Sequence, residues 1–336
     1  MEIDVVLTSG PPDVRDLVAS IRDAGVDGVA TVEGPHDVFV PLVQAALAGG
    51  IDVASYVAIA FPRSPVHLAH TAWDLQALSG GRFRLGLGTQ VRAHVERRYG
   101  ADFDQPVERM AEWVRAVRAV FDCWQDGTPL SFEGSFTTHT VMPPLLSPQP
   151  LEVGSPPILV GALGPKLVEM TTAVADGIVL HPMTSAGFLR TMVDDRIAPG
   201  LAAAGRSRDD FEIVGGALVG VYGDGIADER SVRDGLRSMV AFYGSTPAYR
   251  QVLDDIGVGD LQPRLQEMTR AGEWHRLSEL VDDDLVHQLT VVGDPDHVGT
   301  TLRDRYAGLV DRLSLTFVQE LPVAALPQVL AGVRSG

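Results

Sequence analysis

Three residue patterns in this sequence could carry chemistry, and the first would suit a bound anion. Gly161 and Gly164 allow a ligand to approach the backbone closely, and a helical pattern begins directly after them. Lys166, the only lysine of the chain, falls in the first turn of that helix, where a cation is unfavourable unless an anion is nearby. This combination is typical of a phosphate site. An ordinary strand-to-helix turn with a solvated lysine fits the same residues equally well.

The second pattern is a histidine beside a carboxylate. His36 directly precedes Asp37. An imidazole titrates near neutral pH and a neighbouring carboxylate can orient it, so this pair could move a proton during a reaction. A lone histidine in a loop is more often structural, and the pattern alone does not choose between the two interpretations.

The third pattern is a pair of glycines, Gly86 and Gly88, inside a strand-like run. Such glycines indicate close approach to the backbone, either by a ligand or by packing inside the fold. His67 and His70 share a helix face, but no third ligand accompanies them, so we expect no metal site. The sequence has no serine-hydrolase elbow, Walker loop or zinc-protease motif, which disfavours those enzyme classes.

Eight strand-like apolar runs alternate with helical patterns and must position these residues. The runs are Met1–Thr8, Asp27–Glu33, Ile51–Phe61, Arg82–Gly88, Pro157–Gly161, Gly177–His181, Phe211–Tyr222 and Arg312–Phe317. This alternation predicts an α/β fold, a closed (β/α)8 TIM barrel. An open dinucleotide-binding sheet would need a glycine fingerprint after the first strand, and Ser9–Pro12 does not provide one. We expect one domain over 1–336, with a helical insertion or lid at 231–310 between the seventh and eighth strands.

Function in such a barrel sits on the loops that follow the strands. We therefore expect the loops after strands two to six to converge at one mouth. They are Glu33–Asp37, Ala60–Pro65, Gly86–Gln90 with the segment to Arg98, Gly161–Lys166, and His181–Pro182. A helix is predicted over 107–124 from its apolar stripe. The segment 125–156 is rich in Pro, Gly and Ser and is expected to form a long excursion from the barrel, called the excursion below.

Composition and charge narrow the class of protein. The chain has 336 residues, of which 45% are hydrophobic, which is enough for a large core and excludes wholesale disorder. Its net charge of −17 disfavours nucleic acid and anionic membranes as partners. The single cysteine, Cys123, excludes an internal disulfide framework. No run is long enough to span a bilayer and no basic signal region opens the sequence, so we expect a cytoplasmic protein.

Three segments together resemble the luciferase-like monooxygenase superfamily. Ser79–Thr89, which reads SGGRFRLGLGT, is similar to the superfamily stretch SGGR-x-x-LG-x-G-T. Phe61–Pro65 is similar to its R-x-P element after strand three, and Gly161–Lys166 followed by Ala175–Gly177 to its G-x-x-GP…ADG element. The segments occur in the family's order, and the resemblance covers roughly residues 1–325.

Within the superfamily, the chain most resembles the branch that uses the deazaflavin coenzyme F420. The resemblance rests on Glu33–Asp37 around His36, on Gln90–Tyr99 and on Phe242–Pro247. It implies that His36 moves or stabilises a proton, and that a cis non-prolyl peptide, by position Ser55–Tyr56, lies under the cofactor ring. Val91 stands where the sugar-phosphate dehydrogenases of the branch have a glutamate, so a glucose-6-phosphate substrate is not expected. His94 or Glu96 could then supply the acid or base instead.

The resemblance also implies a set of binding residues. Cofactor contacts are expected from the loops after strands three to six, namely Ser55, Tyr56, Thr89, Gln90, Gly161, Ala162, Leu163, Gly164, Lys166 and His181. Substrate contacts are expected from the loop after strand four and from the insertion, namely His94, Glu96, Tyr243 and Ser245. The insertion could equally be a subdomain that only packs or dimerises.

Three functional hypotheses follow from the resemblance. The first is an F420-dependent oxidoreductase that transfers a hydride between a small organic substrate and the deazaflavin ring. The second is a two-component monooxygenase that uses reduced FMN from a separate flavin reductase together with dioxygen. The third is a non-catalytic flavin or F420 binder. Family members are often homodimers, so a homodimer is expected in each case.

Overall fold

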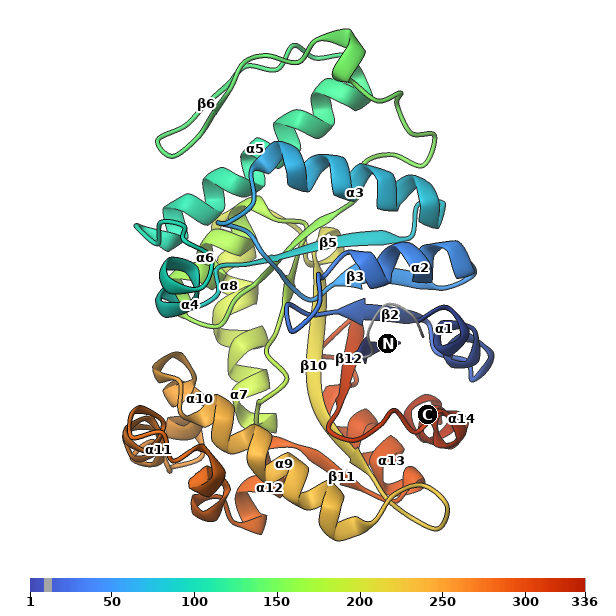
Figure 1. The fold of residues 1–336 in the computed structure, drawn as a ribbon, viewed down its shortest axis with the longest axis vertical. Helices are drawn as coiled ribbons and strands as arrows, with labels where there is room; N and C mark the ends of the chain where they lie inside the picture. Colours follow the sequence, from blue (N-terminus) through green and yellow to red (C-terminus); the bar gives the residue numbers. More distant parts are fainter. Residues whose placement is uncertain (9–13, 336) are drawn as a thin grey trace.

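Eight parallel strands pair around a closed ring, as the sequence predicts. The computed structural model describes residues 1–8 and 14–335, so the loop Ser9–Pro12 lies outside the described residues. The strands of the ring are β1 (Glu2–Leu7), β2 (Gly28–Thr31), β3 (Asp52–Ser55), β5 (Phe83–Gly88), β8 (Ile158–Gly161), β9 (Gly177–Val179), β10 (Glu212–Val221) and β12 (Arg312–Phe317). β12 pairs with β1, with Arg312 opposite Glu2, and this pairing closes the barrel (Figure 1). The predicted TIM barrel is confirmed.

Helices connect the strands around the outside of this barrel. They are α1 (Val14–Asp23), α2 (Val40–Ala48), α3 (Pro65–Ser79), α4 (Arg92–Arg97), α5 (Pro106–Asp126), α6 (Pro165–Val174), α7 (Ala186–Arg190), α8 (Ala198–Ala203), α13 (Pro295–Tyr306) and α14 (Leu326–Arg334). Local sequence explains their ends. The Ser64 hydroxyl accepts the Val66 N–H at 3.3 Å at the start of α3, and Gly80 ends α3 with φ of 65°. None of the helices in the described residues is long and apolar enough to cross a membrane.

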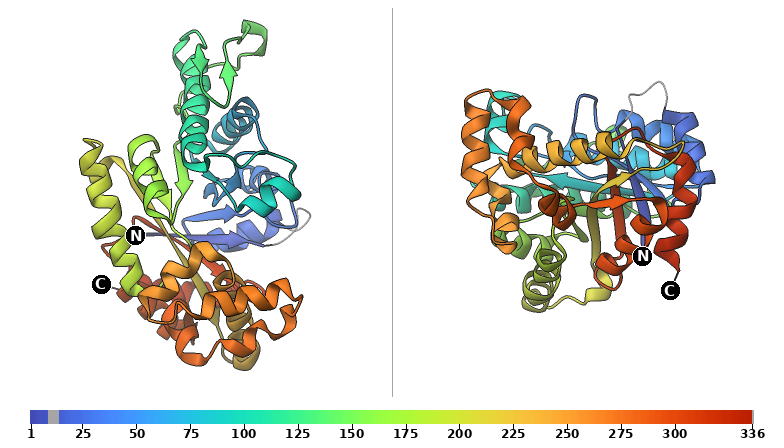
Figure 2. Two further views of the ribbon diagram at one scale, coloured as in Figure 1. Left: turned by 90° about the vertical axis from the view of Figure 1, so that its left-hand side faces the viewer. Right: turned by 90° about the horizontal axis from the view of Figure 1, so that it is seen from below.

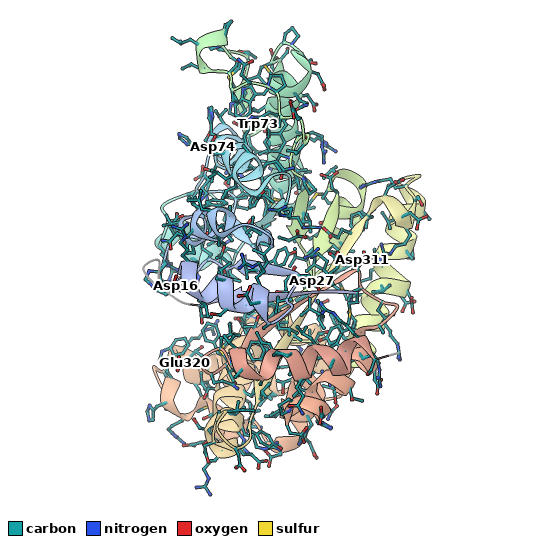
Figure 3. The ribbon with its side chains drawn as sticks, turned by 90° about the vertical axis from the view of Figure 1, so that its right-hand side faces the viewer. Asp16, Asp27, Trp73, Asp74, Asp311 and Glu320 are labelled. Atoms are coloured by element: carbon teal, nitrogen blue, oxygen red, sulfur yellow. The ribbon has the colours of Figure 1, made fainter. Side chains whose placement is uncertain are left out.

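Three aspartates brace the amino-terminal edge of the barrel in the same way. Asp27, Asp176 and Asp311 each come directly before a strand, and each accepts the N–H of the preceding strand of the ring. The distances are 2.8 Å for Ile3, 2.8 Å for Ile158 and 2.7 Å for Ile213. Figure 3 shows Asp27 and Asp311 at this edge. These contacts fix the barrel at the end opposite the predicted mouth.

A buried ionic network fills the barrel interior near the same edge. The Arg312 side chain is 1% exposed, and its Nη2 and Nε donate to the two carboxylate oxygens of Asp4 at 2.6 and 2.9 Å. Arg84 pairs with Glu212 and with Asp52, each at 2.9 Å, and Arg312 reaches the same Asp52 oxygen at 3.0 Å. This buried charged network is not predicted from the sequence. Above the network the interior is apolar, lined by Ala30, Ala54, Leu159, Val179 and Val214.

Two segments extend from the barrel at opposite ends of the long axis of the molecule (Figures 1 and 2). One is the excursion after α5, which carries the hairpin β6 (Phe132–Glu133) and β7 (Thr138–His139). The other, between β10 and β12, contains α9 (Glu229–Gly244), α10 (Arg250–Asp255), α11 (Leu261–Arg270) and α12 (Asp283–Leu289). The short strand β11 (Val291–Gly293), which the sequence did not predict, adds to the carboxyl end of β10 through Val219 opposite Val291.

Candidate functional site

The loops after β2 and β3 are held together by an ion pair at the carboxyl end of the barrel. Glu33 follows β2, and its Oε2 accepts the Ile59 N–H at 3.0 Å and an Arg63 N–H at 2.8 Å. The same Arg63 nitrogen donates to the Ile59 carbonyl at 2.9 Å. Arg98 adds a third loop, because its Nη2 donates to the Gly34 carbonyl at 3.1 Å. His36 therefore lies on a loop whose position is fixed from two sides.

Asp37 does not orient His36, contrary to the sequence interpretation. One Asp37 oxygen accepts the N–H groups of Phe39 and Val40, at 2.8 and 3.2 Å, and so caps the start of α2. The other oxygen lies 3.7 Å from Arg63. The His36 side chain is exposed and makes no hydrogen bond within the described residues. Its ring is free to meet a ligand, and its role in catalysis stays a prediction.

A cis peptide bond is present near the end of β3, but one residue later than predicted. It joins Tyr56 and Val57, not Ser55 and Tyr56. The bond separates β3 from the short strand β4 (Ala58–Ile59), which continues beside β5. The predicted third strand, Ile51–Phe61, is therefore divided into two pieces at this point.

The side chains of Ser55 and Tyr56 are already occupied inside the protein. Ser55 is fully buried, and its hydroxyl donates to the Gly86 carbonyl at 2.9 Å and accepts the Gly86 N–H at 3.0 Å. The Tyr56 hydroxyl donates to Asp4 at 3.0 Å, within the ionic network near the opposite edge. Neither side-chain oxygen is free for a cofactor. The alternation of side chains along a strand points these two groups into the barrel wall and the barrel interior.

Val57 and the Ser55 carbonyl together account for three glycines on the neighbouring strands. A Cβ added at Gly88 would lie 2.4 Å from a Val57 methyl, and one at Gly161 would lie 3.2 Å from the other methyl. A Cβ at Gly86 would lie 2.0 Å from the Ser55 carbonyl oxygen. Of the two sequence interpretations for Gly86 and Gly88, tight packing inside the barrel is therefore correct. Val57 is only partly buried, so it presents a small apolar surface at the mouth.

The loop from Gly161 to Lys166 presents unpaired backbone donors. The N–H groups of Leu163, Gly164 and Lys166 have no hydrogen-bond partner among the described residues. Gly164 is the N-cap of α6, has no capping side chain, and has no atom within 4 Å of where a Cβ would lie. Lys166 is exposed and forms no ion pair with any described residue. The start of a helix with free N–H groups and open space beside it is suited to an anion.

Arg196 joins this loop to the insertion. Its Nη1 donates to the Leu163 carbonyl at 2.8 Å and to the Gln251 side chain at 2.8 Å. Ala162 is buried, and its N–H donates to the Val179 carbonyl of β9 at 3.3 Å. The loop is thus held in place by both of its neighbours, which reduces the ordering needed when a ligand binds.

The loop after β5 contributes a strained residue and an exposed helix. Gln90 has φ of 55°, a conformation that side chains other than glycine rarely adopt, and its side-chain oxygen accepts the Val91 N–H at 2.9 Å. Gln90 and Thr89 are both partly buried. His94 and Glu96 lie on α4 and are exposed, and Glu96 pairs with Arg92 at 2.6 Å. Among the described residues, no hydrogen bond or ion pair joins them to His36, so their predicted substrate role stays a prediction.

His181 follows β9 and packs against two tyrosines of the insertion. Its ring centroid is 4.1 Å from that of Tyr249 and 4.5 Å from that of Tyr243. The Met183 N–H donates to its Nδ1 at 3.1 Å, so the neutral ring carries its proton on Nε2. Burial lowers the pKa of His181 to about 3, which keeps the ring neutral at physiological pH. His181, predicted to bind cofactor, and Tyr243, predicted to bind substrate, are thus brought together.

The lowered pKa of His181 predicts a pH dependence of stability. The unfolded chain takes up a proton near pH 6.5, whereas the folded ring stays neutral down to about pH 3. The wild type should therefore lose stability relative to His181→Gln as the pH falls from 6.5 toward 4. Urea denaturation of both proteins across this range measures the difference. If the free energies of unfolding of the two proteins changed in parallel with pH, the His181 ring would have to be solvated in the folded protein, contrary to this prediction.

Ser245, predicted to contact the substrate, has internal hydrogen-bond partners, and its substrate role stays a prediction. Its hydroxyl donates to the Phe242 carbonyl at 2.7 Å at the end of α9, and its carbonyl accepts from Gln262 at 3.1 Å.

Three features of the site were not identified from the sequence, which are Tyr249, the Glu33–Arg63 pair and Arg196. A signal existed only for Tyr249, which stands two residues beyond the segment Phe242–Pro247.

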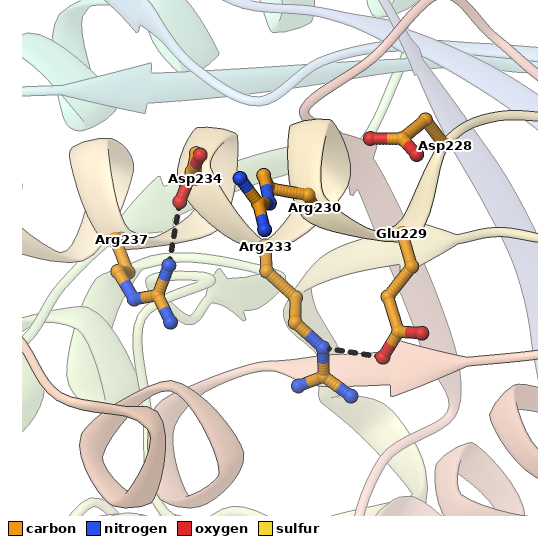
Figure 4. Close-up of a pocket in the computed structure, with 6 residues that line it drawn as sticks. All are labelled: Asp228, Glu229, Arg230, Arg233, Asp234 and Arg237. Carbon is orange, nitrogen blue, oxygen red and sulfur yellow. Dashed lines mark hydrogen bonds and ion pairs between the residues drawn. The ribbon is translucent and has the colours of Figure 1, made fainter.

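Two surface hollows are lined by residues outside the loops described above. The first, along α9, is lined by Asp228, Glu229, Arg230, Arg233, Asp234 and Arg237. Its charges pair along the helix, Arg233 with Glu229 at 2.8 Å and Arg237 with Asp234 at 2.5 Å (Figure 4). The second runs between α5 and the β6–β7 hairpin, where Glu112 accepts three backbone N–H groups of the hairpin at 2.7 Å each. Within residues 1–8 and 14–335, no group of three potential metal ligands comes together.

Sequence relatives cover most of the chain. The family model described as luciferase-like monooxygenase matches residues 4–312. An uncharacterised protein of Mycobacterium tuberculosis is 40% identical, over 93% of this chain and 92% of the relative. A second protein of that organism, provisionally named a coenzyme F420-dependent oxidoreductase, is 30% identical over 86% of each chain. A 5,10-methylenetetrahydromethanopterin reductase of Archaeoglobus fulgidus is 28% identical over 81% of this chain and 74% of the relative.

Solved structures share the fold. The coenzyme F420-dependent tetrahydromethanopterin reductase of Methanopyrus kandleri aligns with a TM-score of 0.80 at 20% identity, over 99% of this chain and 96% of the other. An F420-dependent secondary alcohol dehydrogenase aligns with a TM-score of 0.74 at 14% identity, over 99% of both chains. The EDTA monooxygenase of a Chelativorans strain aligns with a TM-score of 0.70 at 17% identity, over 100% and 93%.

Proposed function

The chain belongs to the luciferase-like monooxygenase family, and on that premise we propose that it is an F420-dependent oxidoreductase acting on a small organic molecule. Two of the relatives described above carry oxidoreductase names, one as an F420-dependent oxidoreductase and the other as a methylenetetrahydromethanopterin reductase. The observation that carries the proposal is the row of N–H groups at Leu163, Gly164 and Lys166, which have no hydrogen-bond partner among the described residues.

The loop before α6 fits the phosphate that F420 carries on its ribityl chain. Backbone N–H groups at a helix start bind phosphate without a dedicated cation, and the space beside Gly164 is open. Lys166 is exposed in the same turn and can add a positive charge. FMN carries the same phosphate, so this loop by itself does not distinguish the two cofactors.

The remaining mouth residues suit hydride chemistry. When bound, F420 supplies a ring carbon, C5, that accepts or donates a hydride. His36, exposed and free of partners within the described residues, would take or give the accompanying proton at the substrate oxygen. The His181 Nε2–H can donate a hydrogen bond to the cofactor or the substrate without itself titrating near neutral pH. Val57 offers an apolar surface against which a planar ring can lie.

A two-component FMN monooxygenase is the second candidate. Fold neighbours such as the EDTA monooxygenase are named as monooxygenases, and the loop from Gly161 to Lys166 would serve the phosphate of FMN equally well. That enzyme would need reduced FMN from a separate reductase. A non-catalytic binder is the third candidate, and tight cofactor binding without electron transfer to any tested acceptor would support it.

An anaerobic binding titration of the purified protein against F420 and FMN, side by side, tests the proposal. Selective binding of F420 at micromolar concentration or tighter is expected. Selective binding of FMN, together with oxygen consumption when reduced FMN is added, would favour the monooxygenase. If neither cofactor binds, both redox proposals fail.

Gly164→Asp should separate cofactor binding from folding. An aspartate is a favourable N-cap and no neighbour obstructs its Cβ, so the stability of the protein should be unchanged or slightly raised. Its carboxylate would repel the phosphate, and F420 affinity should fall by roughly tenfold or more, the effect of about 1.4 kcal/mol. Gly164→Ser, a neutral cap, is the matched control and should retain most of the affinity. Equal affinity in the two variants would place the phosphate elsewhere.

We also propose a homodimer that forms through α2 and α3. α2 has no charged residue, and Asp74, labelled in Figure 3, is the only one in α3. Val40, Leu47 and Leu78 are 47, 56 and 44% exposed on these helices. Two copies with a net charge of −17 each meet with least repulsion at such a neutral face. Sedimentation equilibrium should show a dimer that Leu47→Asp/Leu78→Asp dissociates, and a monomeric wild type at 100 μM would contradict it.

A further inference from the structure

Five aromatic rings form a continuous strip from the carboxyl end of β9 to the surface. His181 contacts Tyr249 and Tyr243, and the centroids of those two tyrosines lie 5.8 Å apart. Phe242 follows, with its centroid 5.4 Å from that of Tyr243, and Trp274 lies 6.4 Å beyond Phe242. The strip therefore begins beside the phosphate loop, because β9 pairs with β8 through Val179 opposite Gly161.

The outer end of the strip is exposed. Phe242 is 46% exposed and Trp274 is 55% exposed. Most apolar residues around them are buried, such as Val240 at 1% and Leu277 at 4%. The insertion thus completes its own core without these two rings. Adjacent large aromatic side chains that remain exposed beside a candidate site are a feature of ligand surfaces.

The strip is electrically neutral but offers hydrogen-bond donors. The His181 ring stays neutral and presents its Nε2–H. Burial raises the pKa of both Tyr243 and Tyr249, so their hydroxyls keep their protons. None of the cation–π contacts among the described residues involves any of the five rings. Such a surface gives little binding energy to a phosphorylated sugar, and it suits a flat uncharged molecule.

We propose that this strip, defined by His181, Tyr243, Tyr249, Phe242 and Trp274, binds the substrate, and that the substrate is a neutral, planar aromatic molecule with a carbonyl or alcohol oxygen. The proposal rests on the proposed function, because it places the substrate's oxygen near His181 and the cofactor mouth. The outer rings would stack on the aromatic body of the substrate, and the inner donors would bind its oxygen.

Isothermal titration of the purified protein with two ketones of similar size tests the proposal. The probes are 2-acetonaphthone, which is planar and aromatic, and cyclohexyl methyl ketone, which is neither. The wild type should bind 2-acetonaphthone at least about tenfold more tightly, and Phe242→Ala/Trp274→Ala should weaken that binding by roughly tenfold. The control Leu145→Ala/Leu146→Ala removes side chains that are 94 and 60% exposed on the excursion. It should leave the affinity for 2-acetonaphthone unchanged. The single variant Trp274→Gln gives a milder test at one exposed position.

The outcomes separate the strip from the proposed function. Equal binding of the two ketones, or unchanged binding in the double variant, overturns the strip. F420 affinity, measured on the same samples, should be the same in the wild type and the double variant. If the wild type binds 2-acetonaphthone through the strip but does not bind F420, the cofactor proposal fails and the strip remains.

Discussion

His36→Ala should lower turnover by roughly a hundredfold or more and leave F420 affinity within about threefold. General acid–base catalysis by a positioned side chain contributes about 10²–10⁴ to the rate. His36 is exposed and has no partner within the described residues, so its removal breaks no internal contact. The loop around it is held by Glu33, Arg63 and Arg98, and these contacts do not depend on the imidazole. The loss should therefore appear in kcat with an F420 substrate pair.

His67→Ala is the matched control for this experiment. His67 is also an exposed histidine, but it lies on α3, outside the barrel. Its replacement should leave turnover unchanged. If His36→Ala retains activity within severalfold of the wild type, the proton must move elsewhere, and His94→Ala and Glu96→Gln on α4 become the next variants to measure.

The fold was predictable because its signal repeats along the chain. Each strand of a parallel barrel is an apolar run followed by a helical pattern, and eight repeats leave few alternatives. The helix at 107–124 was predictable for the same reason, since Met110, Val114, Val117, Phe121 and Trp124 recur at helical spacing and all are buried. The interruption of the third strand at Tyr56–Val57 was not visible, because it replaces no apolar residue in the run.

The loops that form the candidate site were predictable from the sequence, but the contacts of their side chains were not. The Gly161–Lys166 loop could be found because glycines before a helix have few other uses. The directions of the Ser55 and Tyr56 side chains were not predictable, because contacts across the barrel, to Gly86 and to Asp4, decide where they point. Asp37 was misread for a similar reason: it lies beside His36 in the sequence but caps α2. Long-range pairs such as Glu33 with Arg63 leave no local pattern at all.

Within the ionic network of the barrel, a chain of contacts leads from Arg312 to the residues at the mouth. Arg312 contacts Asp4 and Asp52, and Asp4 in turn accepts the Tyr56 hydroxyl. Tyr56 begins the cis peptide bond that leads to Val57 at the mouth. The wall of the candidate site therefore continues directly from the charged layer of the core.

Arg312→Met should destabilise the protein by about 3–5 kcal/mol. Arg312 is 1% exposed and Asp4 is 2% exposed, so the variant leaves a buried carboxylate without its cation and without two hydrogen bonds. Arg208→Met is the matched control, because Arg208 also pairs with an aspartate through two contacts, at 2.8 and 3.0 Å to Asp311, but both side chains are more than 40% exposed. That control should lose about 1 kcal/mol or less.

Urea denaturation monitored by circular dichroism measures both losses on one scale. Adding Asp4→Leu to Arg312→Met should recover part of the stability, because the unpaired carboxylate is then gone and apolar side chains can replace a buried ion pair. A similar loss in Arg312→Met and Arg208→Met would mean that water reaches the barrel interior. In that case the network would act as an exposed ion pair does, and the wall under the mouth would not depend on it.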